Sequence, residues 1–134
     1  MIGILNILKP TGMTSHDVVS AVRKILNIKK IGHAGTLDPI ASGVLPVCIG
    51  GATKFVDYIM KNEKVYLADM KLGVRTDTYD REGTVIDTSD FNLREMDIKS
   101  AVLSFQGEIE QIPPMYSAIK IKGKRLYDLA RQGI

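Results

Sequence analysis

Cysteine and tryptophan are nearly absent from the sequence, which has one cysteine, Cys48, and no tryptophan. A single cysteine can form neither an internal disulfide nor a cysteine-rich metal cluster. The two histidines, His16 and His33, are too few for a zinc site and fall on different expected elements. We therefore expect no bound metal, and we take the cytoplasm as the default location.

Long apolar runs are also absent. The longest surrounds residues 44–49 and is interrupted by Pro46, so no segment is long enough to cross a bilayer. The N-terminus has neither the basic stretch nor the cleavage site of a signal peptide. With 45% hydrophobic and 25% charged residues, the 134-residue chain is typical of one globular unit. No unexplained apolar stripe indicates a self-interface, so we expect a monomer.

The excess of basic residues is small. A net charge of +3 and a pI near 9.0 are compatible with nucleic-acid binding and equally with a solvated basic surface. Lys29 and Lys30 precede a glycine-rich stretch, and a second basic group follows at residues 120–125. A phosphate-binding stripe and a solvated edge strand both fit this pattern, and composition alone favours the solvated edge.

Strand and helix patterns follow one another without a regular βαβ rhythm. This favours an α+β fold, with a mixed, largely antiparallel sheet and flanking helices. A capping-box signature, Thr14 followed by Asp17, predicts a helix that ends near Asn27. We expect further helices after Gly51, around residues 98–105 and over residues 125–132. Strands are expected at residues 2–8 (buried), 44–49, 65–72, 84–87, 108–112 and 117–122, and loops at residues 31–43 and 75–83.

Two motifs contain the residue types of a catalytic or metal site but not the arrangement that such a site needs. Ser15, His16 and Asp17 are the residue types of a hydrolase triad, but neighbours on a helix do not face one another. We expect them to cap the helix and lie on its surface. Asp77 and Asp80 have the wrong spacing for a calcium loop. Since their carboxylates would repel phosphate, we expect them to organise their own loop.

Asp38 lies in the expected loop at residues 31–43, and loops on rigid scaffolds often carry function. It precedes Pro39, which biases its backbone towards an extended conformation. Gly35, nearby, permits a close approach of another backbone. Taken alone, an Asp-Pro pair is more typical of a residue that caps a turn or helix.

Four sequence blocks, in order, resemble the tRNA pseudouridine synthase B family. The most specific is GHAGTLDPIASGVLP at residues 32–46, which continues to residues 51–54. The others are KPTGMTS at residues 9–15, a block over residues 64–80 that begins KVY, and a block over residues 111–131 that begins QIPPMYSAIK. Together they cover nearly the whole chain.

The resemblance implies the pseudouridine synthase fold, incomplete in this chain. Residues 1–134 would be the N-terminal part of the catalytic domain, with its remainder and any C-terminal RNA-binding module absent. The implied activity is isomerisation of uridine to pseudouridine in the T-loop of tRNA, with the T-arm stem-loop as partner. No cofactor is implied, because the product is an isomer. Asp38 would be the nucleophile, and a downstream arginine would pair with it.

The same resemblance implies a substrate-binding group of His33, Tyr66, Gly35 and Lys9. Tyr66 would stack on the flipped uracil and His33 would contact the RNA near it. Lys9 would support the floor behind Asp38. Without the family, Tyr66 is more typical of a core residue on the apolar face of its strand, and His33 of a surface residue.

Two other functions stay open. One is a module that binds the tRNA elbow or aids its folding without turnover. The other is a small hydrolase that uses Asp38, which no further feature of the sequence favours.

Overall fold

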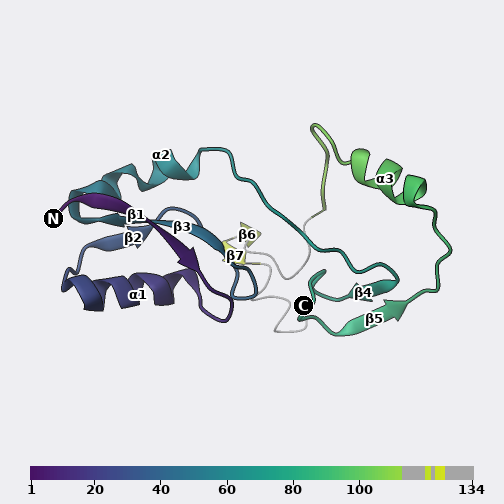
Figure 1. Cartoon of the computed structure of the whole chain (residues 1–134), viewed down its shortest axis with the longest axis horizontal. Helices are drawn as coiled ribbons and strands as arrows, with labels where there is room; N and C mark the ends of the chain where they lie inside the picture. The colour runs from purple at the N-terminus through teal and green to yellow at the C-terminus, as the bar shows by residue number, and fades with distance from the viewer. Residues whose placement is uncertain (113–119, 122, 126–134) are drawn as a thin grey trace. The chain divides into compact units, whose positions relative to one another are not determined.

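The computed structural model describes residues 1–112, 120–121 and 123–125. The chain forms two compact units, Met1–Leu67 and Ala68–Ile134, and each is considered by itself. Figure 1 labels the strands and α-helices of both units. Every strand pair in the described part of the chain is antiparallel, and helices accompany the strands in both units. The expected α+β class with antiparallel pairing is confirmed.

The first unit is built on a three-stranded sheet. Its elements are β1 (Gly3–Lys9), α1 (Ser15–Leu26), β2 (Ile31–His33), β3 (Gly43–Ile49), the 3-10 helix η1 (Gly50–Phe55) and α2 (Val56–Met60). The strand order is β1-β3-β2, so β3 is central and pairs along its length with β1. The expected strand at residues 44–49 and the helix after Gly51 are therefore confirmed.

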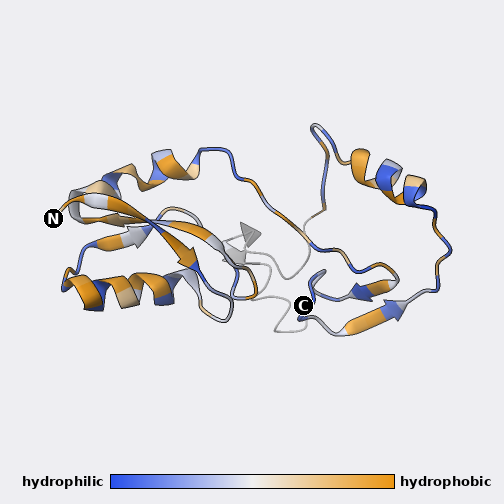
Figure 2. Ribbon diagram, in the orientation of Figure 1, coloured by the Kyte–Doolittle hydropathy of each residue, from blue (hydrophilic) through white to orange (hydrophobic). Residues whose placement is uncertain are grey.

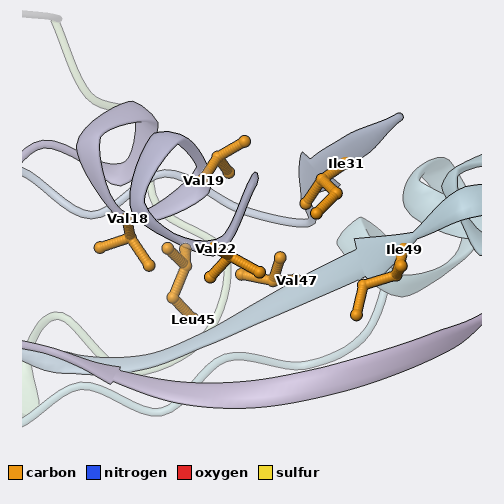
Figure 3. Close-up of a cluster of buried hydrophobic side chains, with 7 residues drawn as sticks. All are labelled: Val18, Val19, Val22, Ile31, Leu45, Val47 and Ile49. Atoms are coloured by element: carbon orange, nitrogen blue, oxygen red, sulfur yellow. The ribbon is translucent and has the colours of Figure 1, made fainter. Parts of the chain in front are cut away.

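Helix α1 covers one face of this sheet. Its buried valines lie within one helical turn of each other and pack on alternate residues of β3, as Figure 3 shows. The cluster consists of Val18, Val19, Val22, Ile31, Leu45, Val47 and Ile49. Full burial of one such side chain contributes about 1.5–3 kcal/mol, so this cluster fixes α1 against β3.

Small residues form a second cluster on the other side of β3. Cys48 is fully buried, and Ala34 and Ala52 lie beside it, with Val56 and Ile59 packed against them. Burial raises the pKa of the Cys48 thiol. Because the thiolate is the reactive form, Cys48 is a packing residue of this cluster.

The strand expected at residues 2–8 is present, but the prediction that it is buried is wrong. In β1, Ile4 is 51% exposed and Leu8 is 73% exposed. Val44, which lies opposite Leu8 in the register, is 64% exposed. These three residues share one face by the alternation of the strands, and Figure 2 shows the hydrophobic character of β1. The first unit thus has an exposed apolar strip, interrupted by Asn6, that the sequence pattern did not reveal.

The second unit contains β4 (Val74–Thr76), β5 (Val85–Thr88), α3 (Glu95–Leu103), β6 (Lys120–Ile121) and β7 (Lys124–Arg125). The strand at residues 84–87 and the helix around residues 98–105 are confirmed, with α3 ending earlier than expected. The strands expected at residues 65–72 and 108–112 are wrong, because neither segment has a paired strand in the part of the chain described. Within residues 117–122 only β6 is described, and Arg125 lies in β7; residues 126–132 of the expected last helix fall outside the described residues.

The expectation for Asp77 and Asp80 is confirmed. Asp80 Oδ1 accepts hydrogen bonds from Thr78 Oγ1 at 2.8 Å and from the main-chain N–H groups of Glu82 and Gly83 at 2.9 and 3.2 Å. Asp77 Oδ1 accepts one from the Thr84 N–H at 2.8 Å. Both carboxylates therefore hold the turn between β4 and β5.

Both expected ends of α1 are confirmed. Thr14 Oγ1 accepts from the Asp17 N–H at 3.1 Å, and Asp17 Oδ2 accepts from the Thr14 N–H at 2.8 Å, which completes a capping box. At the other end Asn27 has a left-handed backbone with φ of 53°. Since α1 is the element that covers the sheet, its N-cap contributes to the stability of the whole unit.

We predict that Thr14→Ala lowers the free energy of unfolding by about 1 kcal/mol, because the alanine leaves a helix N–H group without its acceptor. Denaturant unfolding followed by far-ultraviolet circular dichroism measures the change. Thr53→Ala, which removes a hydroxyl from the short helix η1, serves as a comparison in the same unit. An unchanged unfolding midpoint for Thr14→Ala would contradict the role given to the cap.

The capping box also predicts a pH dependence. The Thr14 hydroxyl and N–H groups hold the pKa of Asp17 below its ordinary value of 3.8. A lowered folded-state pKa contributes stability that is present above pH 3.8 and is lost as the pH falls through the folded value. Asp17→Asn is therefore expected to be less stable than the unaltered chain at pH 7, with the difference shrinking below pH 3.8. Asp69→Asn, in a segment without helix or strand, is the control, and a pH-independent difference for Asp17→Asn contradicts the assignment.

Candidate active site

The candidate site lies on the loop that joins β2 to β3. The whole stretch of residues 31–43 was expected to be a loop, and its two ends are not: Ile31–His33 form β2 and Gly43 begins β3. Ile31 is only 4% exposed and pairs with Ile49, so sheet pairing and burial together override the turn-rich composition. The remaining loop, residues 34–42, carries Asp38 at its middle.

Ser15 fixes the main chain just before Asp38. The Ser15 hydroxyl accepts a hydrogen bond from the Leu37 N–H at 2.9 Å and donates one to the Leu37 carbonyl at 3.2 Å. The Leu37 side chain packs against the valine cluster of the core. Ser15 is 3% exposed, so the expectation that it lies on the surface is wrong. No sequence pattern links residues 22 positions apart, although Ser15 does end the first of the four family blocks.

The main chain just after Asp38 is fixed as well. The Gly12 N–H donates a hydrogen bond to the Pro39 carbonyl at 2.7 Å. The Ala41 N–H donates to the main-chain carbonyl of Asp38 at 3.0 Å, which closes a turn. Both flanks of Asp38 are thus held by residues 12–15, which precede or begin α1.

The Asp38 side chain itself is exposed. Among the described residues no hydrogen bond or ion pair engages its carboxylate, and the bond that closes the turn uses its main-chain oxygen. A capping aspartate would accept that bond with its side chain. The hydrogen bonds of Ser15 and Gly12 thus hold the backbone on both sides of Asp38 and do not involve its carboxylate.

Lys9 ends β1 and is fully buried. Its Nζ donates hydrogen bonds to the carbonyls of Pro10 at 2.8 Å and Met13 at 2.7 Å. The ammonium group therefore ties together the turn that contains Gly12, whose N–H holds Pro39. This is the geometry of a supporting residue, and the side chain presents no surface to a substrate in this structure.

His33 and Gly35 are joined by a hydrogen bond of 2.5 Å from His33 Nδ1 to the Gly35 carbonyl. Since a carbonyl only accepts, Nδ1 is the donor in this contact. Gly35 has φ of 131°, a conformation that favours glycine. A Cβ at Gly35 would meet no atom within 4 Å, so backbone conformation is the reason for glycine in this chain.

Tyr66 is not a core residue. It is 70% exposed and belongs to residues 63–71, a segment with neither helix nor strand. No hydrogen bond joins Tyr66 to Lys9, His33 or Asp38 within the described part of the chain. In the first unit, Lys9 and Asp38 lie at two turns that contact each other. His33 is hydrogen-bonded to Gly35 in the same unit. Tyr66 lies near the C-terminal end of that unit.

Among the residues that the structure describes, no group of three or more histidine, cysteine, aspartate or glutamate side chains is arranged to hold a metal ion. Within the same residues, no helix combines the length and the apolar character needed to cross a membrane.

Comparison with known proteins identifies relatives of the whole chain. A protein from Clostridium kluyveri described as tRNA pseudouridine synthase B is 62% identical over 134 residues, which are all of this chain and 46% of that protein. A protein of the same description from Alkaliphilus oremlandii is 60% identical, again over the whole chain and 45% of its own length. This chain therefore spans about half the length of the curated relatives it matches.

A solved structure supports the fold. A chain in the crystal structure of a Cbf5-Nop10-Gar1 complex aligns with a TM-score of 0.60 and 35% identity, covering 88% of this chain and 31% of that one. The family model described as TruB family pseudouridylate synthase (N terminal domain) matches residues 23–134. That match includes Asp38 and most of the blocks on which the resemblance rested. The chain belongs to the TruB family of pseudouridylate synthases.

Proposed function

We propose that the protein containing this chain converts uridine to pseudouridine in the T-loop of tRNA, with Asp38 as the nucleophile. The observation that carries the proposal is the exposed Asp38 on a main chain held at both flanks, in a chain of this family. Relatives about 60% identical to the chain are described as tRNA pseudouridine synthase B, which supports tRNA as the substrate.

The reaction breaks the N1–C1′ bond of uridine and forms a C5–C1′ bond after the uracil has rotated. The proton on C5 is lost and N1 gains one, so the product is an isomer and no redox cofactor is consumed. Asp38 attacks the ribose or the base and is released when the new glycosidic bond has formed. A carboxylate suits this role because its unperturbed pKa, about 3.9, leaves it ionised at neutral pH.

The target base is stacked in the RNA and must be extruded before it reaches Asp38. Exposed Tyr66 is the residue we assign to stack on the flipped uracil, a contact worth about 1–3 kcal/mol. His33, whose Nδ1 is engaged by the Gly35 carbonyl, contacts the RNA beside it. Gly35 and Lys9 shape the site through the backbone.

Residues 1–134 are, in this proposal, the N-terminal part of the catalytic domain, since the relatives are about twice as long. A downstream arginine pairs with Asp38, and the exposed apolar strip of Ile4, Leu8 and Val44 is a surface for the remainder of the domain. We propose a cytoplasmic monomer, with the T-arm stem-loop of tRNA as its partner. Activity is therefore to be tested in the intact protein.

We predict that Asp38→Asn abolishes pseudouridine formation in a T-arm stem-loop, with a loss on the order of 10³-fold or more, because the amide is not a nucleophile. Binding of the same RNA should be retained. A pseudouridine-specific chemical label is the measurement, because substrate and product have the same mass. Asp57→Asn, an exposed carboxylate in the same unit, is the matched control.

Two outcomes would separate the alternatives. Turnover by Asp38→Asn would show that another group is the nucleophile. Tight RNA binding by the unaltered protein without product would favour the binding-module function.

We further predict that Ser15→Ala lowers the maximal rate by about 10- to 10²-fold at saturating RNA, because it releases the main chain next to Asp38. The concentration of RNA that gives half the maximal rate should change little. Ser15→Thr keeps the hydroxyl and should restore much of the rate, while Thr14→Ala lowers stability without touching Leu37. Equal rates for Ser15→Ala and Thr14→Ala would show that the contact with Leu37 has no positioning role.

A further inference from the structure

The positive charge of the chain is concentrated in one segment. The twenty residues 18–37 contain four basic residues and no carboxylate. The other 114 residues contain 14 basic and 15 acidic residues, so they are almost neutral in sum. The segment runs from the first turn of α1 through β2 to the candidate site.

A pocket lies at the C-terminal end of α1 within this segment. Its volume is about 460 Å³, it is open to solvent, and its lining residues are Ser20, Arg23, Lys24, Asn27, Ile28 and Lys29. Five of the six are polar and three are cationic. A hydroxyl, an amide and three cations without a carboxylate are the donor set of a phosphate site.

Arg23 is held at the wall of this pocket. Its Nη2 donates a hydrogen bond to the Ile31 carbonyl at 2.7 Å, which fixes the guanidinium against β2. Its Nε is buried. An arginine guanidinium carries several N–H donors in a fixed planar arrangement. In Arg23 one of them, Nε–H, has no hydrogen-bond acceptor in the part of the chain that is described.

Stabilisation of the helix dipole explains only two of the three cations that line the pocket. Arg23 and Lys24 lie in the last turn of α1, where cations interact favourably with the helix dipole. Lys29 lies beyond the helix, in the turn before β2. Neither Lys24 nor Lys29 forms an ion pair among the residues described, so three positive charges are gathered without a counter-ion there.

We propose that this pocket binds a backbone phosphate of the RNA substrate, at a position remote from the reacting nucleotide. Ser15, at one end of α1, contacts the loop of Asp38, and the pocket lies at the other end. A helix of 12 residues is about 18 Å long, so the phosphate belongs to a nucleotide several positions from the target uridine. The inference rests on the proposed function for the identity of the RNA.

The experiment compares Lys24→Gln/Lys29→Gln with Lys54→Gln/Lys61→Gln in the intact protein. All four lysines are exposed residues of the first unit, and each double variant removes the same charge. Binding of a T-arm stem-loop is measured by fluorescence anisotropy over a range of salt concentrations. The pocket variant is expected to bind about 10-fold more weakly near 0.1 M salt, and its slope of log affinity against log salt should fall by about 1–2. In the control variant, the affinity and the salt slope should each change by less than about half as much as in the pocket variant.

Phosphate ethylation interference supplies a second measurement. A remote phosphate whose ethylation weakens binding of the unaltered protein, but not of the pocket variant, is the expected result. Equal affinities and salt slopes for the two double variants would overturn the inference. If the unaltered protein binds the RNA but forms no pseudouridine, the proposed function is refuted. The inference about the pocket is not, because the pocket is tested by RNA affinity. Absence of RNA binding by the unaltered protein would overturn both.

Discussion

Ser15 exchanges two hydrogen bonds with the main chain of Leu37, at 2.9 and 3.2 Å, and this contact joins the start of α1 to the loop that carries Asp38. Leu37 also packs on the valine cluster between α1 and β3, so the loop is anchored to the most buried part of the unit. Any shift of α1 against the sheet would move Leu37 and, with it, the neighbouring aspartate. The position of the main chain at Asp38 is therefore set by hydrophobic packing and by the hydrogen bonds of Ser15 and Gly12.

Features that depend on neighbours in sequence could be predicted. The capping box of Thr14 and Asp17, the end of α1 at Asn27 and the turn held by Asp77 and Asp80 all involve residues within a few positions of each other. Such contacts leave a recognisable spacing in the sequence. The central strand β3 was equally clear, because it is a short apolar run with turn residues on either side.

Features that depend on partners distant in the sequence could not be predicted. The alternating pattern at residues 65–72 has the period of a strand, but a strand needs a hydrogen-bonding neighbour, and none is present in the described part of the chain. Ile31–His33 has turn-rich surroundings and becomes a strand because β3 pairs with it. Asp38, His33 and Tyr66 were selected only through the family, since each has a common structural role when taken alone. Ser15 was missed because its partner lies 22 residues away.

The buried ammonium group of Lys9 explains why the first and second family blocks go together. The Nζ of Lys9 donates hydrogen bonds to the carbonyls of Pro10 and Met13 in the turn that follows β1. An apolar side chain in place of Lys9 would remove both hydrogen bonds, each of which contributes about 0.5–1.5 kcal/mol net. With the turn closed, Gly12 presents its N–H to Pro39, while Ser15 holds Leu37 on the other flank. Residues 9–15 thus form the support on which Asp38 is placed, and the identity of Lys9 follows from the hydrogen bonds that this support needs.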